Sequence, residues 1–476
     1  MSVPDPAAAA GTTSQPLYVA EIKIYPRAVT GRFATWRWTM VWLTQAFFYG
    51  MPWLQWNGRQ AMLFDLDSRH FYVLGLMMVP QDFIYLAALL VICALGLFFV
   101  TALAGRVWCG YACPQTVYTE MFMWIELHTE GDRGARMRLD KAPWGWDKLR
   151  RKGGKHLAWG ALALATGFTF VGYFTPIRGL AADVARLDVS GWALFWILFY
   201  GGITYGNAGW LREQMCKYMC PYARFQSALI DKDSLIITYD QARGEPRGSR
   251  PRGTVARDLG QGDCIDCTLC VQVCPTGIDI RKGLQNECIG CAACIDVCDQ
   301  VMDKVGAPAG LIRYATAQGV EKRWTRLQML KRALRPRVLV YFSVLAALCG
   351  GFVWSLASRA PYQVDVLKDR AALARVVDEG AIENLYRLQI ANRSERPQHL
   401  RIRAEGLPGL ATELRREVDL APAGIASLPV QLLLPAAEAA AAGRGSHPIR
   451  FVVEATGDGG TATASVAAPA SFYVPD

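Results

Sequence analysis

The sequence predicts a multi-domain membrane protein with five transmembrane α-helices, a small cysteine-rich domain and a C-terminal β-sandwich. First, 52% of its 476 residues are hydrophobic and fifteen are tryptophan, which is the composition of a membrane protein. Second, eight of the fourteen cysteines lie within residues 264–298, as two copies of one spacing. Third, residues 362–476 contain no cysteine and alternate short apolar runs with turns rich in glycine and proline.

The membrane part is predicted from five apolar runs. A helix needs about twenty apolar residues to cross the hydrocarbon core of a bilayer. The five runs that approach this length are residues 38–56, 83–104, 157–177, 191–211 and 338–357. A buried core helix is the alternative for any single run, but residues 83–104 carry no charge. An odd number of spans places the two ends of the chain on opposite sides of the membrane.

The basic residues predict the orientation. Lysine and arginine are concentrated in residues 133–155 and 322–337, so both segments are expected on the cytoplasmic side. The loops around residues 65–82 and 178–188 have balanced charge, as the outer side allows. This topology explains the net charge of +10, and no nucleic-acid partner is expected. Residues 1–37 lack the features of a cleavable signal and are predicted to be a cytoplasmic tail.

The two cysteine runs predict two iron–sulfur clusters. They read C-I-D-C-T-L-C-V-Q-V-C-P and C-I-G-C-A-A-C-I-D-V-C-D, which is the spacing of bacterial two-cluster ferredoxins. In that pattern three close cysteines bind one 4Fe-4S cluster, and the fourth of each run binds the other cluster. The predicted ligands are Cys264, Cys267, Cys270 and Cys298 for one cluster, and Cys288, Cys291, Cys294 and Cys274 for the other. A pair of zinc knuckles is the alternative, but these use two-plus-two ligand groups. Asp299 stands where the second run would have its proline, a departure that affects a turn and no ligand.

An internal repeat supplies four more cysteines. The runs R-V-W-C-G-Y-A-C-P and E-Q-M-C-K-Y-M-C-P follow the second and fourth apolar runs, and each ends in a C-x-x-x-C-P motif. We name Cys109, Cys113, Cys216 and Cys220 the CxxxCP cysteines. If each motif is helical, its two sulfurs lie one turn apart on one face, and the proline starts a new turn.

Three interpretations of the CxxxCP cysteines are open. Thiolates and thioethers are soft ligands that favour monovalent copper, so the four cysteines are predicted to bind copper, with Met215 and Met219 as further ligands. Alternatively, the four cysteines hold a third iron–sulfur cluster. The third interpretation treats them as small buried apolar residues.

The chain is divided into seven predicted parts. They are a tail (1–37), a four-helix membrane domain (38–220), a linker (221–260), a two-cluster domain (261–315), a basic helix (316–337), the fifth span (338–357) and the sandwich (362–476). Strands of the sandwich are predicted at residues 385–392, 399–404, 413–420, 426–434, 449–455 and 461–466. Regularly spaced short strands with polar turns predict a β-sandwich, placed on the outer side by the span count.

These motifs together resemble the FixG/RdxA/CcoG family of cytochrome oxidase accessory proteins, over nearly the whole chain. The resemblance rests on the paired CxxxCP motifs, the run G-D-C-I-D-C-T-L-C-V-Q-V-C-P-T-G-I-D-I-R and the following C-A-A-C-I-D-V-C-D-Q-V-M-D-K-V-G. It implies an immunoglobulin-like C-terminal domain in the periplasm, clusters in the cytoplasm and a location in the bacterial inner membrane. It also implies reduction of cupric to cuprous ion for delivery to cbb-type haem-copper oxidases.

The predicted mechanism is an electron relay. A cytoplasmic or quinol donor supplies the electrons. The cuprous ion then passes to a copper chaperone or exporter and to the oxidase assembly machinery. A homodimer is a further expectation. The alternatives are a quinol-linked electron-transfer subunit of a respiratory complex and a non-catalytic assembly scaffold. Haem in the membrane is not expected, because His70, His128 and His156 all lie outside the five runs.

Overall fold

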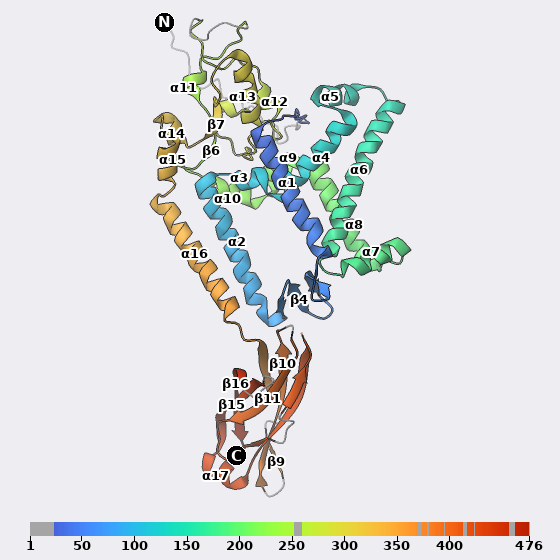
Figure 1. Ribbon diagram of the computed structural model, residues 1–476, viewed down its shortest axis with the longest axis vertical. Helices are drawn as coiled ribbons and strands as arrows, with labels where there is room; N and C mark the ends of the chain where they lie inside the picture. The colour runs from blue at the N-terminus through green and yellow to red at the C-terminus, as the bar shows by residue number, and fades with distance from the viewer. Residues whose placement is uncertain are drawn as a thin grey trace, which may run out of the picture. The chain divides into compact units, whose positions relative to one another are not determined.

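The computed structural model describes residues 23–251, 259–368, 374–377, 380–394, 396–412, 417–422, 424–456 and 462–475 (Figure 1). The chain forms two compact units. Unit 1 comprises Met1–Thr39, Ala104–Trp159 and Asn207–Met329, and unit 2 comprises Met40–Leu103, Gly160–Gly206 and Leu330–Asp476. All twelve cysteines that sequence analysis singled out belong to unit 1.

The cysteine-rich part of unit 1 is a small two-stranded domain (Figure 1). Strands β6 (Ile236–Tyr239) and β7 (Ile312–Ala315) pair antiparallel and enclose both cysteine runs in sequence. Helix α12 (Leu269–Gln272) lies in the first run and α13 (Ala293–Val305) in the second, with the 3₁₀ turn η6 (Ile280–Lys282) between them. Their apolar side chains form one buried cluster around Ile237, Ile295 and Met302.

The rest of unit 1 is helical. Helix α3 (Val107–Tyr111) leads into α4 (Pro114–Glu130) and α5 (Arg133–Lys141), and α6 (Trp146–Val171) begins in this unit. Later in the chain come the π-helical turns η3 (Asn207–Leu211) and η4 (Met215–Met219), which flank the short α9 (Arg212–Gln214). Helices α10 (Pro221–Leu229) and α11 (Gln241–Gly244) follow, so the predicted linker at 221–260 contains two helices and a strand.

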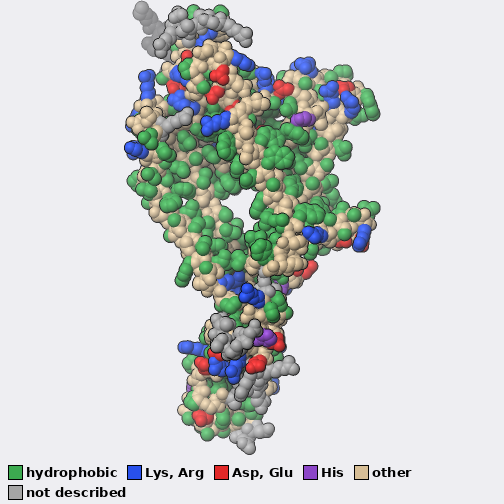
Figure 2. All heavy atoms as spheres, viewed as in Figure 1, with side chains coloured by type: hydrophobic (Ala, Val, Ile, Leu, Met, Phe, Trp, Pro, Cys, Tyr) green, Lys and Arg blue, Asp and Glu red, His purple; other side chains and the backbone are tan. Residues whose placement is uncertain are grey.

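Two helices of unit 2 are long and apolar enough to cross a membrane, α2 (Phe83–Ala104) and α16 (Pro336–Ala357). Figure 2 shows hydrophobic side chains covering the surface over both helices. They pack together through aromatic pairs, Tyr85 with Phe352 at 6.0 Å and Phe99 with Phe342 at 6.1 Å between ring centroids. A third span results if α7 (Ile177–Arg186) and the segment Gly191–Met219, bent by 98°, are counted as one.

The prediction of five spans is therefore not confirmed, since the described residues contain two or three helices of sufficient length and apolarity. The other predicted spans are helical but interrupted or mixed in polarity. Helix α1 (Arg32–Gly50) ends before Pro52, and α6 begins with a basic stretch. Helix α8 (Gly191–Gly206) has only 16 residues before the π turn η3.

Short elements complete this unit. A three-stranded sheet has the order β3-β4-β5, and β1 pairs with β2. Their bounds are β1 (Gln55–Trp56), β2 (Arg59–Gln60), β3 (Met62–Asp65), β4 (His70–Val73) and β5 (Leu76–Met78), flanked by η1 (Met51–Trp53) and η2 (Pro80–Asp82).

The predicted basic helix at 316–337 is instead two helices, α14 (Ala317–Glu321) and α15 (Arg326–Arg332), followed by the start of α16 at Pro336.

The C-terminal domain is a β-sandwich of two antiparallel sheets. One sheet has the order β12-β14-β10-β8, with β9 beside β10, and the other has the order β13-β11-β15-β16. The strands are β8 (Tyr362–Lys368), β9 (Arg375–Val376), β10 (Ile382–Asn392), β11 (Gln398–Glu405), β12 (Ala411–Thr412), β13 (Glu417–Leu420), β14 (Ile425–Leu434), β15 (Gly445–Thr456) and β16 (Ala462–Val474). Helix α17 (Ala436–Ala442) connects β14 to β15.

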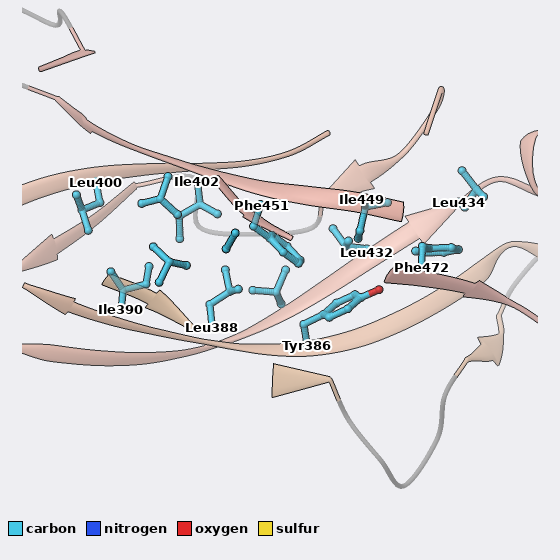
Figure 3. Close-up of a cluster of buried hydrophobic side chains, with 14 of the residues drawn as sticks. Tyr386, Leu388, Ile390, Leu400, Ile402, Leu432, Leu434, Ile449, Phe451 and Phe472 are labelled. Atoms are coloured by element: carbon cyan, nitrogen blue, oxygen red, sulfur yellow. The ribbon is translucent and has the colours of Figure 1, made fainter. Parts of the chain in front are cut away.

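The two sheets share one apolar core (Figure 3). Tyr386 and Leu388 of β10 face Phe451 of β15, and the rings of Tyr386 and Phe451 lie 5.2 Å apart. Alternate residues of β10 are buried, which is the period of a strand with one face on a core. Each of the six predicted strands overlaps an observed one, although residues 413–416 and 461 lie outside the described residues.

Candidate metal centres

The structure brings the eight cysteines of the two runs together as two groups of four. We name Cys264, Cys267, Cys270 and Cys298 the first thiol group, and Cys274, Cys288, Cys291 and Cys294 the second thiol group. Cys298 is close enough to interact electrostatically with the other three members of the first group. Cys274 interacts in the same way with the other three members of the second group. The last cysteine of each run thus lies with the first three of the other run.

The two runs have the same backbone shape. In the first, Asp266 and Thr268 have positive φ angles of 54° and 56°. At the equivalent positions of the second run, Gly290 and Ala292 have φ angles of 72° and 60°. Three of these four residues are not glycine, and such residues rarely adopt a left-handed conformation unless the surroundings require it. The repeated strain indicates that both loops are held in one ligand-binding shape.

Each thiol group lines a cavity of its own. The first cavity has its four cysteines among Tyr239, Val301 and Leu311, and the second has its four cysteines among Ile237, Ile280 and Ile289. Four convergent thiols with apolar surroundings fit a 4Fe-4S cluster, since cluster ligands are thiolates. Cys267 is the exposed member of the first group, so this cavity lies nearer to solvent.

The CxxxCP cysteines form a third group. The thiol of each interacts electrostatically with the other three, although the two motifs are about a hundred residues apart in sequence. Cys113 is the N-cap of α4 and Cys220 is the N-cap of α10, and in both helices a proline takes the first position. Each motif therefore spans a break between two helical segments, because proline disfavours a helical conformation in the residue before it. The part of each motif before the break is helical, α3 in the first motif and η4 in the second, and the proline starts a new helix as predicted.

The surroundings of this third group are partly apolar. Burial raises the pKa of Cys109 to about 11, so without a bound cation this thiol remains protonated at neutral pH. The side-chain amide of Gln226, which is fully buried, donates to the sulfur of Cys109 at 3.2 Å. Met219 is 60% exposed, whereas Met215 is half-buried at the other end of η4.

The first CxxxCP motif lies directly against the loop of the second thiol group. A Cβ atom at Gly110 would be 2.6 Å from the carbonyl oxygen of Gly290, so the two backbones touch. The buried guanidinium of Arg106 donates to the carbonyl oxygens of Asn286, Cys288 and Ala223. Arg106 thereby joins the first motif, the second thiol group and the helix that follows the second motif.

The N-terminal segment contributes two further contacts. The side chain of Arg37 donates to the carbonyl oxygen of Cys291 at 2.7 Å and lies 3.6 Å from the carboxylate of Glu120. The carboxylate of Asp296, within the second cysteine run, accepts hydrogen bonds from the backbone N–H groups of Phe33 at 3.0 Å and Ala34 at 2.7 Å. Asp296 therefore caps α1, a helix remote in sequence.

A small cavity separates Cys216 from the second thiol group. Both Cys216 and Cys291 line it, together with Thr276 and Glu120.

The sequence patterns identified all twelve cysteines but none of the side chains that position them, such as Arg106, Arg37 and Gln226. Arg106 is the one with a local signal, because it opens the first CxxxCP run, although the second run has Glu213 at the same position.

Comparison with known proteins gives three matching families. A family described as "4Fe-4S dicluster domain" matches residues 211–317, and one described as "4Fe-4S binding domain" matches residues 86–129. A third, "IG-like fold at C-terminal of FixG, putative oxidoreductase", matches residues 352–475. The two iron–sulfur matches include the CxxxCP cysteines as well as both thiol groups.

Several relatives match most of the chain. The nitrogen fixation protein FixG of Rhizobium meliloti is 39% identical over 424 residues, covering 83% of this chain and 81% of FixG. The protein RdxA of Cereibacter sphaeroides is 36% identical over 415 residues, covering 86% of this chain and 87% of RdxA. RdxB of the same organism is 37% identical over 411 residues, covering 85% and 86%.

Proposed function

Since this chain belongs to the FixG/RdxA family, as its motifs predicted, we propose that it reduces cupric to cuprous ion for assembly of a cbb-type haem-copper oxidase. The relatives and the matched families make it an iron–sulfur electron-transfer protein. The copper activity is the further step. The observation that carries it is the meeting of the four CxxxCP cysteines beside the second thiol group.

The two thiol groups are the proposed ligands of two 4Fe-4S clusters. The first group would hold one cluster and the second group the other, with the last cysteine of each run exchanged. The clusters supply one-electron chemistry when bound. The role of the protein is to keep the second group at a fixed distance from the CxxxCP cysteines, through Arg106 and the contact of Gly110 with Gly290.

The CxxxCP cysteines are the proposed site of copper reduction. Cuprous ion prefers sulfur, whereas cupric ion prefers nitrogen and oxygen, so a site of four thiols stabilises the product over the substrate. Binding of copper would displace the thiol protons. Met215 and Met219 are proposed as weaker thioether ligands, with Met215 the better placed because Met219 is largely exposed.

The proposed topology has five spans in the bacterial inner membrane. In it the clusters lie in the cytoplasm and the sandwich in the periplasm. The proposed division still has seven parts, with strand β6 counted in the two-cluster domain and not in the linker. Two basic segments support this orientation, residues 133–155 and 322–337, since cytoplasmic loops are enriched in lysine and arginine. The proposed partners are a copper chaperone or exporter, the oxidase assembly machinery and an electron donor; a homodimer is also part of the proposal.

A third iron–sulfur cluster is the second candidate for the CxxxCP cysteines. It is favoured by the match of residues 86–129 to a 4Fe-4S binding family, because that segment contains Cys109 and Cys113 but neither thiol group. A quinol-linked respiratory subunit and a scaffold without redox chemistry are the remaining alternatives to copper reduction.

The decisive experiment starts from protein reduced with dithionite and then freed of the reductant. Addition of cupric ion should oxidise the iron–sulfur centres and produce an equal amount of cuprous ion, measured with a cuprous chelator. Protein that keeps its centres reduced in the presence of cupric ion would contradict the proposed function. Protein stripped of iron provides the control for reduction of copper by thiols alone.

A further inference from the structure

A second, larger cavity of unit 1 lies close to the CxxxCP cysteines. Its volume is about 410 Å³, within the range of pockets that hold small organic ligands. Its walls include Glu126, Lys155, His156, Trp159, Trp210 and Arg212. None of these residues has a role in the function proposed above.

The cavity lies where polar helix ends meet apolar segments. His156 is the point at which α6 changes from a basic stretch, which ends at Lys155, to the apolar stretch that starts at Leu157. Trp210 lies in the π turn η3, directly after the apolar helix α8. A ligand with a polar head and an apolar tail would enter at such a boundary, with its head in the cavity.

The cations around the cavity all have carboxylate partners, which they share: two arginines share Glu126, and two lysines share Glu130. Arg212 donates to both oxygens of Glu126, at 2.6 and 3.1 Å, and Arg136 donates to the same carboxylate at 2.7 Å. Lys152 and Lys155 lie 3.1 and 2.9 Å from the carboxylate of Glu130. Because these cations already have carboxylate partners, the wall suits a neutral ligand better than a phosphate or another anion.

The remaining wall is aromatic. Trp159 is buried, stacks on Phe122 at 5.0 Å and is covered by the cations of Lys155 and Arg212. The rings of His156 and Trp210 lie 6.1 Å apart with an angle of 18° between their planes. Flat walls of this kind favour a planar ring as ligand, and the imidazole offers it a hydrogen-bonding group.

The backbone at this point is unusual. Arg212 has a φ angle of 33° and lies between the two π turns η3 and η4. π turns within helices occur frequently at functional sites, and a strained residue persists only where its surroundings hold it. The double hydrogen bond of Arg212 with Glu126 is such a restraint.

The cavity shares part of its wall with the smaller cavity next to Cys216. Arg212 and Glu213 line both this cavity and the smaller cavity whose wall contains Cys216 and Cys291. A redox-active ring in the larger cavity would therefore be close to both centres that take part in the proposed function.

We propose that this cavity binds the head group of a membrane quinol, which is the electron donor of the protein. The inference rests on the proposed copper reduction, for which it names the reductant. One quinol and two cupric ions give one quinone, two cuprous ions and two protons, and the protons pass to His156 and Glu213 in the wall. A quinol gives two electrons and a cupric ion takes one, and one-electron carriers such as iron–sulfur clusters would pass the two electrons on singly.

The test compares two exposed tryptophans, Trp210 of η3 in the cavity and Trp192 near the start of α8, which is 74% exposed and does not line the cavity. A photoreactive quinone analogue should label the peptides containing residues 152–159 and 207–214 in protein purified in lipid nanodiscs. Excess decylubiquinone should abolish this labelling. Trp210→Leu should weaken quinone binding by about tenfold, and Trp192→Leu should leave it within about twofold.

The two hypotheses fail in different ways. The first outcome is protein that still reduces copper after dithionite treatment but is labelled by the quinone analogue outside the two predicted peptides, or is not labelled. This outcome would overturn the quinol site alone. Labelling that is suppressed by added phosphatidylglycerol and not by decylubiquinone would assign the cavity to an anionic lipid and also overturn it. A third outcome is quinone labelling at the two predicted peptides in protein whose iron–sulfur centres are not oxidised by cupric ion and which does not catalyse oxidation of decylubiquinol by cupric ion. This outcome would overturn copper reduction and not the quinol site.

Discussion

Gly110 lies against Gly290 so closely that a Cβ atom on Gly110 would be 2.6 Å from the carbonyl oxygen and 2.7 Å from the carbonyl carbon of Gly290. A Cβ on Gly290 would in turn be 2.9 Å from the carbonyl oxygen of Arg106, and its φ angle of 72° also favours glycine. This backbone contact places Cys109 next to the loop that carries Cys291. Two glycines thus set the spacing between a CxxxCP motif and the second thiol group.

We predict that Gly110→Ala separates these two parts. The new methyl group meets backbone atoms, which cannot move aside as a flexible side chain can, so the change should cost about 1–3 kcal/mol of stability. The second thiol group should lose iron faster on heating, measured by the decay of the iron–sulfur absorption. Gly153→Ala in α6, where a Cβ would meet nothing within 4 Å, is the control and should be neutral or slightly stabilising. Equal heat stability of the two variants would contradict this role of Gly110.

The sequence was sufficient to predict the family of this protein but not its internal contacts. Short-range patterns identified both thiol groups and the sandwich strands, because a cysteine spacing or an alternation of apolar residues is local information. The contacts of Arg106, Arg37 and Gln226 join segments that are remote in sequence, and no spacing predicts them. The span count was predicted from the length of the apolar runs, and the helix breaks near Pro52 and in η3 make the helices shorter than those runs.

The capping of α1 by Asp296 leads to a second prediction. Gly31 precedes the first turn of α1 and has no side chain to cap it, and a Cβ there would be 2.5 Å from the carboxylate carbon of Asp296. Asp296→Ala should destabilise this turn by about 0.5–2 kcal/mol, the usual cost of losing a cap. Hydrogen exchange at the amides of Phe33 and Ala34 should accelerate accordingly.

A matched control for Asp296 lies on the same helix. Asp303 is exposed near the end of α13, so Asp303→Ala should leave exchange in α1 unchanged. Unaltered exchange at Phe33 and Ala34 in the Asp296→Ala variant would mean that the cap contributes nothing to the stability of α1.

The ion pairs of Asp140 give a third prediction, for pH dependence. Burial opposes ionisation of this carboxyl group, but hydrogen bonds from Lys152, Lys23 and Tyr25 outweigh it and hold the pKa of Asp140 well below its usual range. A carboxylate with a lowered pKa stabilises the folded state above its unfolded pKa, and this contribution is lost as the pH falls toward the folded value.

Asp140→Asn should therefore loosen the hairpin of α5 and α6 at pH 7, seen as faster hydrogen exchange over residues 133–152. The difference from the parent protein should shrink as the pH is lowered through about 4, the unfolded pKa of aspartate. Asp147, whose side chain is 62% exposed, forms surface ion pairs with Arg150 and Arg151, so Asp147→Asn should have little effect at either pH. A difference that grows toward low pH would show that the sign of this linkage is wrong.

The exchange of the fourth cysteine between the runs gives a fourth prediction. The intact protein should contain about eight irons, and replacement of one ligand should leave about four, from the rule of four thiolates per cluster. Cys298→Ala should lose the same spectroscopic signal as Cys267→Ala, and Cys274→Ala the same signal as Cys291→Ala. Because Cys267 is exposed, the signal of the first group should also be the more sensitive to a soluble chelator. If Cys298→Ala instead matched Cys291→Ala, each run would hold its own cluster.

The last prediction concerns the choice between copper and a third cluster at the CxxxCP cysteines. If they bind copper, the double variant Cys216→Ser and Cys220→Ser should weaken cuprous binding and slow cupric reduction by about tenfold or more, with both thiol groups spectroscopically intact and iron unchanged at about eight per chain. Met215→Leu and Met219→Leu should cause smaller losses, because a thioether is a neutral and weaker ligand. Parental protein with about twelve irons, falling to about eight in the cysteine double variant, would assign the four cysteines to a third cluster. Copper reduction at the parental rate in the double variant, with iron unchanged, would exclude these two cysteines from the reaction and leave their convergence with Cys109 and Cys113 as a matter of packing.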